Sequence, residues 1–207
     1  TNCIPEFIGA AFPPPIPQVK HVCINTPARD QLAYRTGVSG FVIPNVLRFE
    51  EEPSGVDAYS SDVREEFGLS PDDVVILQPT RVVPRKGIEH SIELVRRLGD
   101  PRYKLVISHG AGDEGLDYFE FLQEHAHNRG VDLRIVAGRV DRKRVNNGDG
   151  KKVYTLWDIY PHADLVTYPS LYEGFGNAFL EAVYFKKPIL VNRYSVYQTD
   201  IELLGFD

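Results

Sequence analysis

The sequence has two cysteines, no methionine and no long apolar run, and each shortage narrows the class of protein. Cys3 and Cys23 are too few for a disulfide framework, which favours a reducing compartment. No apolar segment approaches the roughly 20 residues of a membrane-spanning helix, and no secretory signal begins at Thr1. We therefore expect a cytoplasmic protein, with peripheral attachment to the inner membrane face as an option. The absence of methionine predicts a mature, trimmed or partial chain.

Positive charge is also in short supply. Lys and Arg number 23 against 29 Asp and Glu, and the net charge of −6 argues against bulk nucleic-acid binding. No His and Cys cluster has the spacing of a zinc site, so we expect no metal. The 207 residues, 43% of them hydrophobic, allow one globular domain with an appendage.

From residue 41 onward, short apolar runs alternate with segments of helical periodicity. Apolar strands separated by helices predict a parallel sheet covered on both faces, so the expected fold class is α/β, a doubly wound Rossmann-like domain. The expected strands are residues 73–78, 103–108, 133–137, 164–168 and 188–191. The expected helices are residues 62–67, 87–98, 116–128, 154–162 and 178–185.

The chain is organised around residues 169–182, which read PSLYEGFGNAFLEA. Glu173 and Glu181 lie eight positions apart in it, and Asn177 is a good N-cap for the helix that follows. Free backbone N–H groups at a helix start bind anions, and a carboxylate one turn further in accepts hydrogen bonds from a vicinal diol. The stretch therefore predicts a binding site for a phosphate, a ribose and a sugar. The alternative is an ordinary helix start with a capping carboxylate.

The stretch resembles the Pro-Ser-x-x-Glu-Gly-Phe-Gly-x-x-x-x-Glu-Ala signature of retaining glycosyltransferases with two Rossmann-like domains, the GT-B type of family 4. The resemblance implies transfer of a hexose from a UDP-, GDP- or ADP-sugar, with this chain carrying the donor site. It implies that Glu173 touches the donor sugar and that Glu181 holds the ribose diol. The implied donor-binding residues of the same stretch are Gly174, Phe175, Gly176, Asn177, Ala178 and Phe179.

A second motif follows the first expected strand of this domain. Residues 79–87 read PTRVVPRKG and resemble the family's Arg-x-x-x-x-Lys-Gly turn. Arg81 and Lys86 would stabilise the charge that develops on the departing diphosphate, and with Glu173 they form the implied catalytic set. Arg85 is expected to point elsewhere. The alternative is a solvated basic turn.

A third segment, Gly138, Arg139 and Val140, ends the expected strand 133–137. In the resembled family this place contacts the nucleotide base through backbone groups. The basic segment 141–152 that follows is expected to be a solvated loop, with contact to an anionic acceptor as the alternative. Trp157 is expected in the core. His109 is expected to be a loop histidine satisfied by backbone groups.

Residues 110–115, GAGDEG, form a literal G-x-G-x-x-G with Asp132 at a dinucleotide-like distance. Asp113 and Glu114 would place negative charge against a pyrophosphate, which argues against a nicotinamide cofactor, and no cofactor is expected. Three alternatives to the transferase stay open: a sugar-nucleotide epimerase of the same fold, an NAD-dependent oxidoreductase using this loop, and a non-catalytic binding module.

The resemblance also implies how the chain is divided. Residues 1–40 resemble the tail end of an N-terminal acceptor domain, or a connector, and residues 41–207 a donor domain truncated at its C-terminus. The implied partners are the nucleotide sugar, an acceptor (a carbohydrate, a lipid-linked sugar or a small molecule) and the missing N-terminal domain. One departure is Lys186, which stands where the family usually ends the helix with glycine; a left-handed non-glycine residue there costs roughly 1 kcal/mol, or else the helix has to end in another way.

Overall fold

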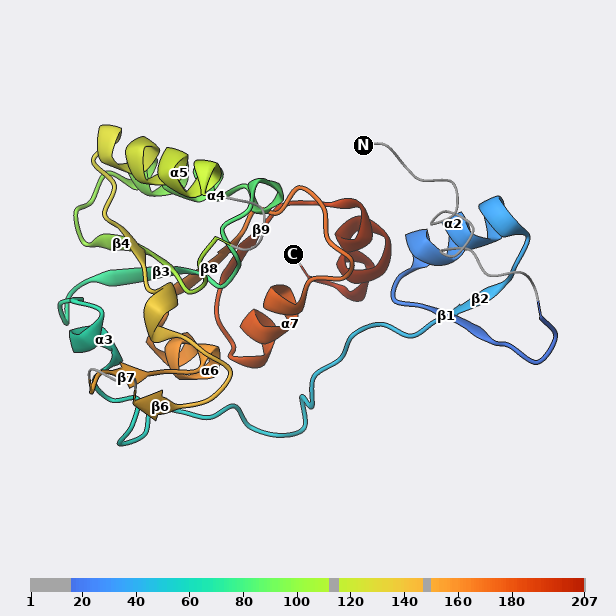
Figure 1. Cartoon of the computed structure of the whole chain (residues 1–207), viewed down its shortest axis with the longest axis horizontal. Coiled ribbons are helices and arrows are strands. Elements are labelled where there is room, and N and C mark those ends of the chain that lie inside the picture. Colours follow the sequence, from blue (N-terminus) through green and yellow to red (C-terminus); the bar gives the residue numbers. More distant parts are fainter. Residues whose placement is uncertain (1–15, 112–115, 147–149, 207) are drawn as a thin grey trace. The chain divides into compact units, whose positions relative to one another are not determined.

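The computed structural model describes residues 16–111, 116–146 and 150–206, which pack as two units (Figure 1). One unit contains residues Thr1–Val46, Tyr172–Gly176 and Arg193–Asp207, and the other contains Leu47–Leu171 and Asn177–Asn192. The units interleave along the chain, whereas the sequence suggested one boundary after residue 40. That domain assignment stays a prediction, and each unit is described by itself below.

The larger unit, Leu47–Leu171 with Asn177–Asn192, is built on a five-stranded sheet whose strands are all parallel. Their order is β5-β4-β3-β8-β9. The predicted α/β fold class is thus confirmed. The strands are β3 (Val74–Gln78), β4 (Tyr103–Ile107), β5 (Leu133–Ile135), β8 (Leu165–Tyr168) and β9 (Ile189–Val191).

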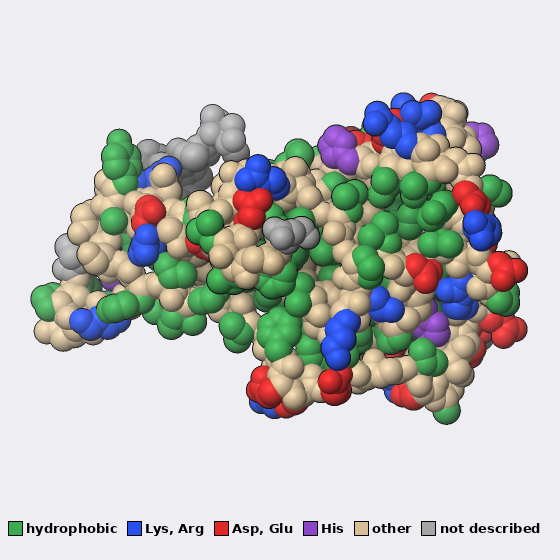
Figure 2. All heavy atoms as spheres, turned by 180° about the vertical axis from the view of Figure 1, so that it is seen from behind, with side chains coloured by type: hydrophobic (Ala, Val, Ile, Leu, Met, Phe, Trp, Pro, Cys, Tyr) green, Lys and Arg blue, Asp and Glu red, His purple; other side chains and the backbone are tan. Residues whose placement is uncertain are grey.

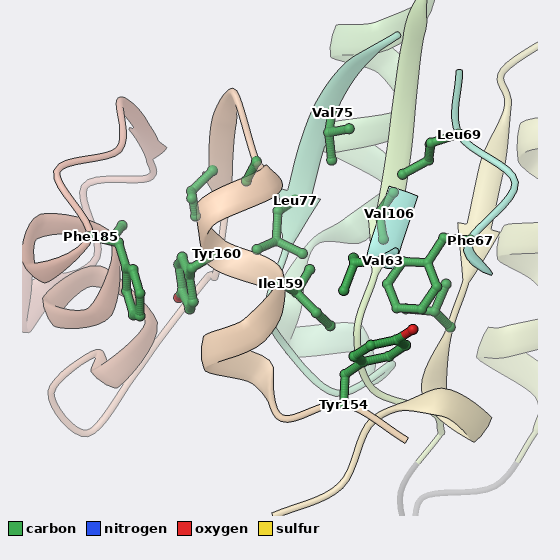
Figure 3. Close-up of a cluster of buried hydrophobic side chains, with 14 of the residues drawn as sticks. Val63, Phe67, Leu69, Val75, Leu77, Val106, Tyr154, Ile159, Tyr160 and Phe185 are labelled. Atoms are coloured by element: carbon green, nitrogen blue, oxygen red, sulfur yellow. The ribbon is translucent and has the colours of Figure 1, made fainter. Parts of the chain in front are cut away.

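Helices cover both faces of this sheet (Figure 1). Along β3, Ile76 packs into one apolar cluster while Val75 and Leu77 pack into the other, as the two-residue period of a strand requires. Figure 3 shows Val75 and Leu77 directed toward the second cluster. The Ile76 face is covered by α4 (Ile88–Leu98) and α5 (Asp117–Asn128), and the opposite face by α3 (Val63–Glu66), α6 (Leu156–Ile159) and α7 (Asn177–Tyr184).

Two expectations for this unit were wrong. The helix expected over 154–162 is only four residues long, and a 3-10 turn, Tyr160–His162, follows it. Pro161 explains the break, because a proline lacks the N–H that an α-helix needs in its interior. The basic segment 141–152 contains strand β6 (Val145–Asn146), which pairs antiparallel with β7 (Lys152–Val153), and is therefore more than a solvated loop.

Helix α7 ends at a left-handed residue, one of the two outcomes that the sequence left open for Lys186. Lys186 has a φ of 54°, and among the described residues it is the non-glycine residue recorded in the left-handed region. Its exposed ammonium group lies 3.0 Å from the Glu52 carboxylate. The left-handed turn that glycine usually makes at a helix end is here made by a strained lysine.

The smaller unit, Thr1–Val46 with Tyr172–Gly176 and Arg193–Asp207, contains a strand, helix, strand unit. Strand β1 (His21–Cys23) pairs parallel with β2 (Gly40–Val42), and α2 (Thr26–Thr36) connects the two strands. Its C-terminal segment forms a π-helical turn, Tyr197–Ile201, and a 3-10 turn, Glu202–Leu204. The Thr26 N–H donates to the Asp200 carboxylate at 2.7 Å, which joins the two segments.

The surface carries charges of both signs (Figure 2). On α4, Glu93 forms ion pairs with Arg96 and Arg97, one helical turn away. No helix in the described part of the chain has the length and apolar character needed to cross a membrane.

Candidate functional site

The sheet of the larger unit has a reversal point at its centre. The chain runs from β3 to β4 and β5 on one side, then returns to place β8 and β9 on the other side of β3. The loops that leave the carboxyl ends of β3 and β8 therefore diverge, and parallel sheets bind ligands at such a point. The turn containing Arg81 and Lys86 follows β3 there, and residues 169–171 follow β8.

Lys86 is held at this reversal point. Its residue is 8% exposed, and its ammonium nitrogen lies 5.3 Å from the centre of the Tyr168 ring, at the end of β8. The next residue, Gly87, has a φ of 60°, and a Cβ there would come within 2.6 Å of the Pro169 carbonyl oxygen. The turn after β3 thus contacts the loop after β8 so closely that glycine is required.

A buried glutamine, which the sequence analysis missed, supports the same turn. Gln78 is fully buried at the end of β3; its Oε1 accepts hydrogen bonds from Ser91 Oγ at 2.6 Å and Thr167 Oγ1 at 3.3 Å. Its Nε2 donates to the Lys86 carbonyl at 3.3 Å. One side chain therefore ties the turn to α4 and β8. The sequence signal that could have identified Gln78 is a polar residue at the end of an otherwise apolar strand.

Arg81 and Lys86 act on a common neighbour, His109. Burial lowers the pKa of His109, and the charges of Arg81 and Lys86 lower it further. Its Nδ1 is 2.7 Å from Ser108 Oγ, so a hydroxyl rather than a backbone group satisfies it, contrary to expectation. The charges of Arg81 and Lys86 therefore both act at the carboxyl end of β4, where they favour an anion.

A cavity of about 900 Å³ adjoins this positive region. His109 and Val140 line it together with Trp157 of α6. The Arg139 side chain points elsewhere: its Nε donates to the Lys152 carbonyl at 2.7 Å, and its guanidinium pairs with Glu66. Any ligand contact of Arg139 therefore has to come from its backbone, in the 3-10 turn Ala137–Arg139 that also contains Gly138.

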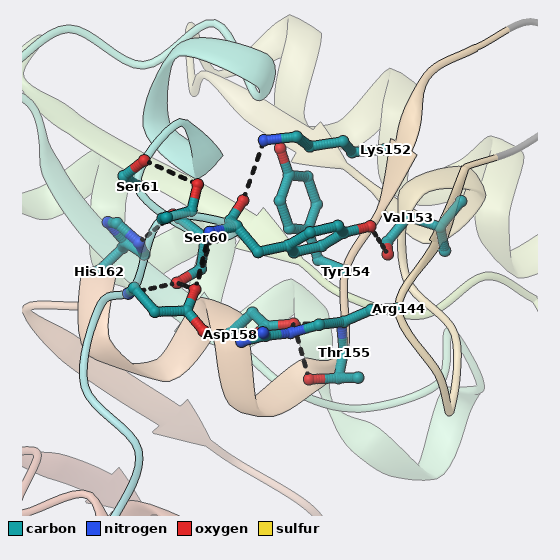
Figure 4. Close-up of polar contacts among 12 residues, drawn as sticks. Ser60, Ser61, Arg144, Lys152, Val153, Tyr154, Thr155, Asp158 and His162 are labelled. Atoms are coloured by element: carbon teal, nitrogen blue, oxygen red, sulfur yellow. Dashed lines mark hydrogen bonds and ion pairs between the residues drawn. The ribbon is translucent and has the colours of Figure 1, made fainter.

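Ion pairs fix the hairpin that borders the cavity (Figure 4). The Arg144 guanidinium binds the carboxylates of Asp57, at 2.7 Å, and Asp158. Asp158 is 4% exposed and forms a capping box with Thr155 at the start of α6. Burial by itself raises the pKa of Asp158, but the bonds from Arg144 and Thr155 lower it overall. Lys152 Nζ likewise lies 2.6 Å from Asp62.

Glu181 lies in α7, and its carboxylate accepts a hydrogen bond from a neighbouring aromatic side chain. Tyr160 donates its hydroxyl to Glu181 Oε2 at 3.0 Å. Burial raises the pKa of Glu181, and Tyr160 and then Trp157 act in the opposite direction. Trp157 packs on Tyr184 and Phe185, but it is 37% exposed and lines the cavity, so the expectation of a core residue was wrong.

The first turn of α7 begins at Asn177, so the helix starts one residue earlier than predicted. Ala178 and Phe179, whose N–H groups are predicted to bind phosphate, are buried in this turn. Their role as anion-binding residues stays a prediction.

The other residues of the predicted signature, Glu173 to Gly176, belong to the smaller unit. Burial and then the charge of Glu173 raise the pKa of Tyr194, whose hydroxyl donates to the Phe175 carbonyl at 2.7 Å. The carbonyl of Gly174 accepts from Asn25, and Gly176 has a φ of 123°, which favours glycine. The catalytic assignment of Glu173 stays a prediction.

Two other sequence hypotheses concern this region. Of the glycine-rich segment 110–115, residues 112–115 lie outside the described residues, so the dinucleotide alternative stays open there. Across residues 16–111, 116–146 and 150–206, no group of three or more His, Cys, Asp or Glu side chains is arranged to hold a metal ion.

Residues 60–201 match the family described as "Glycosyl transferases group 1". The chain belongs to this family. The membership confirms the resemblance seen in residues 169–182. Over 99% of its length, this group 1 chain is 34% identical to mannosylglucosylglycerate synthase of Petrotoga mobilis, and over 97% it is 35% identical to the synthase of the same name from Thermotoga maritima.

The solved structure of HepE from Anabaena in complex with UDP-glucose is similar in fold. The TM-score is 0.65 at 17% sequence identity, and the match covers 86% of this chain and 45% of HepE. The chain spans about half the length of the curated relatives it matches, 50% of the Petrotoga protein and 48% of the Thermotoga protein. The similarity to HepE shows that the chain has the fold of a glycosyltransferase structure.

Proposed function

We propose that this chain carries the donor site of a retaining hexosyltransferase that uses a UDP-, GDP- or ADP-sugar. The observation that carries the proposal is the cavity lined by His109, Val140 and Trp157, since the charges of Arg81 and Lys86 act on His109 and Trp157 acts on the Glu181 carboxylate. A nucleotide sugar requires cations for its diphosphate, a cavity for its base and a pair of acceptor oxygens for its ribose diol. The UDP-glucose bound to the similarly folded HepE supports this reading.

In this arrangement the nucleoside occupies the cavity of about 900 Å³. Backbone groups at Val140 contact the base, Glu181 accepts from the ribose hydroxyls, and the N–H groups at the start of α7 meet the phosphates. Glu173 contacts the hydroxyls of the donor sugar, in keeping with the family signature.

Catalysis in this proposal is electrostatic. As the bond from the sugar to the diphosphate breaks, negative charge grows on the leaving phosphate, and Arg81 and Lys86 stabilise it. The departing phosphate takes the proton of the acceptor hydroxyl, and neither a metal nor a cofactor takes part. The acceptor is a carbohydrate, a lipid-linked sugar or a small molecule. The relatives' name contains a small glycosylated glycerate, which favours the last of these.

Calorimetric titration with UDP, GDP, ADP and NAD tests the donor site. We expect one nucleoside diphosphate to bind, with unchanged affinity in EDTA, and NAD not to bind. Lys86→Ala should weaken binding of that diphosphate by about 1–3 kcal/mol, the value of hydrogen bonds to charged groups, and leave the matching nucleoside unaffected. Glu181→Ala should weaken binding of the ribose diphosphate more than binding of its 2′-deoxy form, which keeps only one of the two hydroxyls that Glu181 accepts.

Binding of NAD in place of all three diphosphates would favour the oxidoreductase alternative. Equal weakening of diphosphate and nucleoside by Lys86→Ala would remove Lys86 from the phosphate site. Loss of binding in EDTA would overturn the metal-free mechanism.

A further inference from the structure

We propose that Tyr160 is a positioning residue that holds the Glu181 carboxylate in the orientation needed to accept the two ribose hydroxyls of the donor. This inference rests on the proposed function, and it adds a residue to which neither the family motif nor the sequence analysis assigned a role in binding. It starts from the contact between the Tyr160 hydroxyl and Glu181 Oε2, at 3.0 Å.

The Tyr160 side chain is fixed on all sides. Its residue is fully buried, and its ring stacks on Phe185 with 4.7 Å between centroids and 3° between planes. Figure 3 shows the two side chains beside each other. The hydroxyl also lies 3.4 Å from the Ala178 carbonyl oxygen, one turn before Glu181 in α7. A rigid ring thus places a single donor against two successive turns of the same helix.

The backbone that carries Tyr160 is anchored as well. In the 3-10 turn Tyr160–His162, His162 Nε2 lies 2.9 Å from the Ser60 carbonyl oxygen. Lys187, just beyond α7, donates from Nζ to the Pro161 carbonyl at 3.0 Å. The turn is therefore tied to both neighbouring segments, so Tyr160 has little freedom to leave Glu181.

The chemistry of the contact suits a ligand-binding carboxylate. Tyr160 donates to Glu181 and carries no charge. Together with the neutral Trp157 side chain it favours the charged form of the carboxylate, without cancelling the charge that attracts hydroxyl donors from a ligand. Tyr168 is the other titratable group that acts on Tyr160.

The test compares two tyrosine to phenylalanine variants of the same chain. Tyr160→Phe removes the hydroxyl from Glu181 and keeps the stacked ring. Tyr154→Phe is the matched control, because Tyr154 is also fully buried and donates to a carboxylate, Asp62 Oδ1, at 2.8 Å. Each is titrated with UDP, GDP and ADP and with their 2′-deoxy forms over a range of pH.

Loss of one hydrogen bond should weaken binding of the ribose diphosphate by about threefold to tenfold in Tyr160→Phe, with a smaller change for the 2′-deoxy form, which keeps one of the two hydroxyls. The pH below which affinity falls should rise in Tyr160→Phe, because the Glu181 carboxylate loses a donor that favours its charged form. Tyr154→Phe should match the unsubstituted chain in both readouts.

If Glu181→Gln weakens ribose binding but Tyr160→Phe changes neither affinity nor pH profile, the inference is wrong while the proposed function stands. If the unsubstituted chain binds no diphosphate, the proposed function itself fails. A second measurement needs no substitution: the ¹³C signal of the Glu181 carboxyl should show an isotope shift between H₂O and D₂O from its hydrogen-bonded donors. No shift would overturn the proposal.

Discussion

Two neighbouring segments of the larger unit hold carboxylates in opposite ways. Asp158, buried at the start of α6, is bound by the Arg144 guanidinium and by Thr155, and its pKa is lowered overall. Glu181, half-buried in α7, accepts from the neutral Tyr160 hydroxyl, and its pKa is raised by burial. Within the described residues, no ion pair involves Glu181, whereas Asp158 has one.

This difference separates a structural carboxylate from a binding one. Asp158 has its charge cancelled inside the protein, so it stabilises the fold and offers little to a ligand. Glu181 keeps a charge that its surroundings do not cancel, at a cost in folding free energy. Such a cost is common at functional sites, where a perturbed pKa accompanies a ligand.

Removing Arg144 should produce the largest change in stability. Arg144→Ala leaves Asp158 buried without its cation, and we expect the free energy of unfolding to fall by about 2–3 kcal/mol, below the value of a fully buried pair because the guanidinium is partly exposed. Arg96→Ala is the control, since its pair with Glu93 lies at the surface and should matter little. Chemical denaturation measures both. Equal effects would show that Asp158 does not need its cation.

Replacing each carboxylate by its isosteric amide should affect Glu181 and Asp158 in opposite ways. Glu181→Gln should weaken nucleoside diphosphate binding by about 1–3 kcal/mol and should not lower the melting temperature, because the amide carries no buried charge. Asp158→Asn should lower the melting temperature, because Arg144 and Thr155 lose a charged partner. Thermal melts and calorimetry on both variants decide the matter. A large loss of stability in Glu181→Gln would mean that its carboxylate is structural as well.

Acid should separate Glu181 from Asp132, which like Asp158 is held by a cation. Because the folded state raises the pKa of Glu181, protonation favours folding, so the stability advantage of Glu181→Gln at neutral pH should vanish as pH falls toward 4.5. Hydrogen bonds from Arg134 and then Lys104 lower the pKa of Asp132 to about 2, so its contribution to stability is present above pH 3.8 and is lost as pH falls to about 2. Thermal melts of the unsubstituted chain and of Glu181→Gln between pH 8 and pH 3 test this. If folding did not shift the pKa of Glu181, the melting temperatures of the two proteins would differ by the same amount at every pH.

The smallest expected effect is at the end of α7. Lys186→Gly should relieve the left-handed strain and raise the free energy of unfolding by about 0.5–1 kcal/mol, while the lost surface pair with Glu52 matters little. Denaturant melts test this, with Lys187→Gly as a control that should not stabilise. The stabilised chain would be a useful background for the Arg144 and Glu181 variants. A loss of stability would mean that the Glu52 pair outweighs the strain.

Much of the fold follows from local pattern. The apolar runs that form β3 and β8, and the glycine at position 87, mark in the sequence the two strand ends at which the reversal point lies. The family signature similarly singles out Glu181 and Lys86. These features are readable because each depends on neighbours in the sequence, such as strand periodicity, turn residues and a helix start.

The side chains that hold the site residues in place could not be predicted from local sequence pattern. Tyr160 and Glu181 are 21 positions apart, and Gln78 meets Thr167 across 89 positions, so only the packed sheet brings them together. The hairpin at Val145 was missed because its strands are two residues long and exist through contacts such as the Tyr59 hydroxyl with Val145 and Val153 carbonyls. Tertiary packing decides such contacts, and sequence periodicity does not reveal them.

The central claim is that Glu181 and the cavity at Trp157 form one nucleotide site. Trp157 is the single tryptophan of the chain; it lines the cavity and acts on the pKa of Glu181, so its fluorescence reports on the site directly. Titration with UDP, GDP and ADP should give a saturable change in emission for one of them, with a tenfold or weaker affinity in Glu181→Gln, about 1.4 kcal/mol. If calorimetry detects nucleotide binding while Trp157 emission stays constant, or if Glu181→Gln binds with equal affinity, the nucleotide binds elsewhere and the account is wrong.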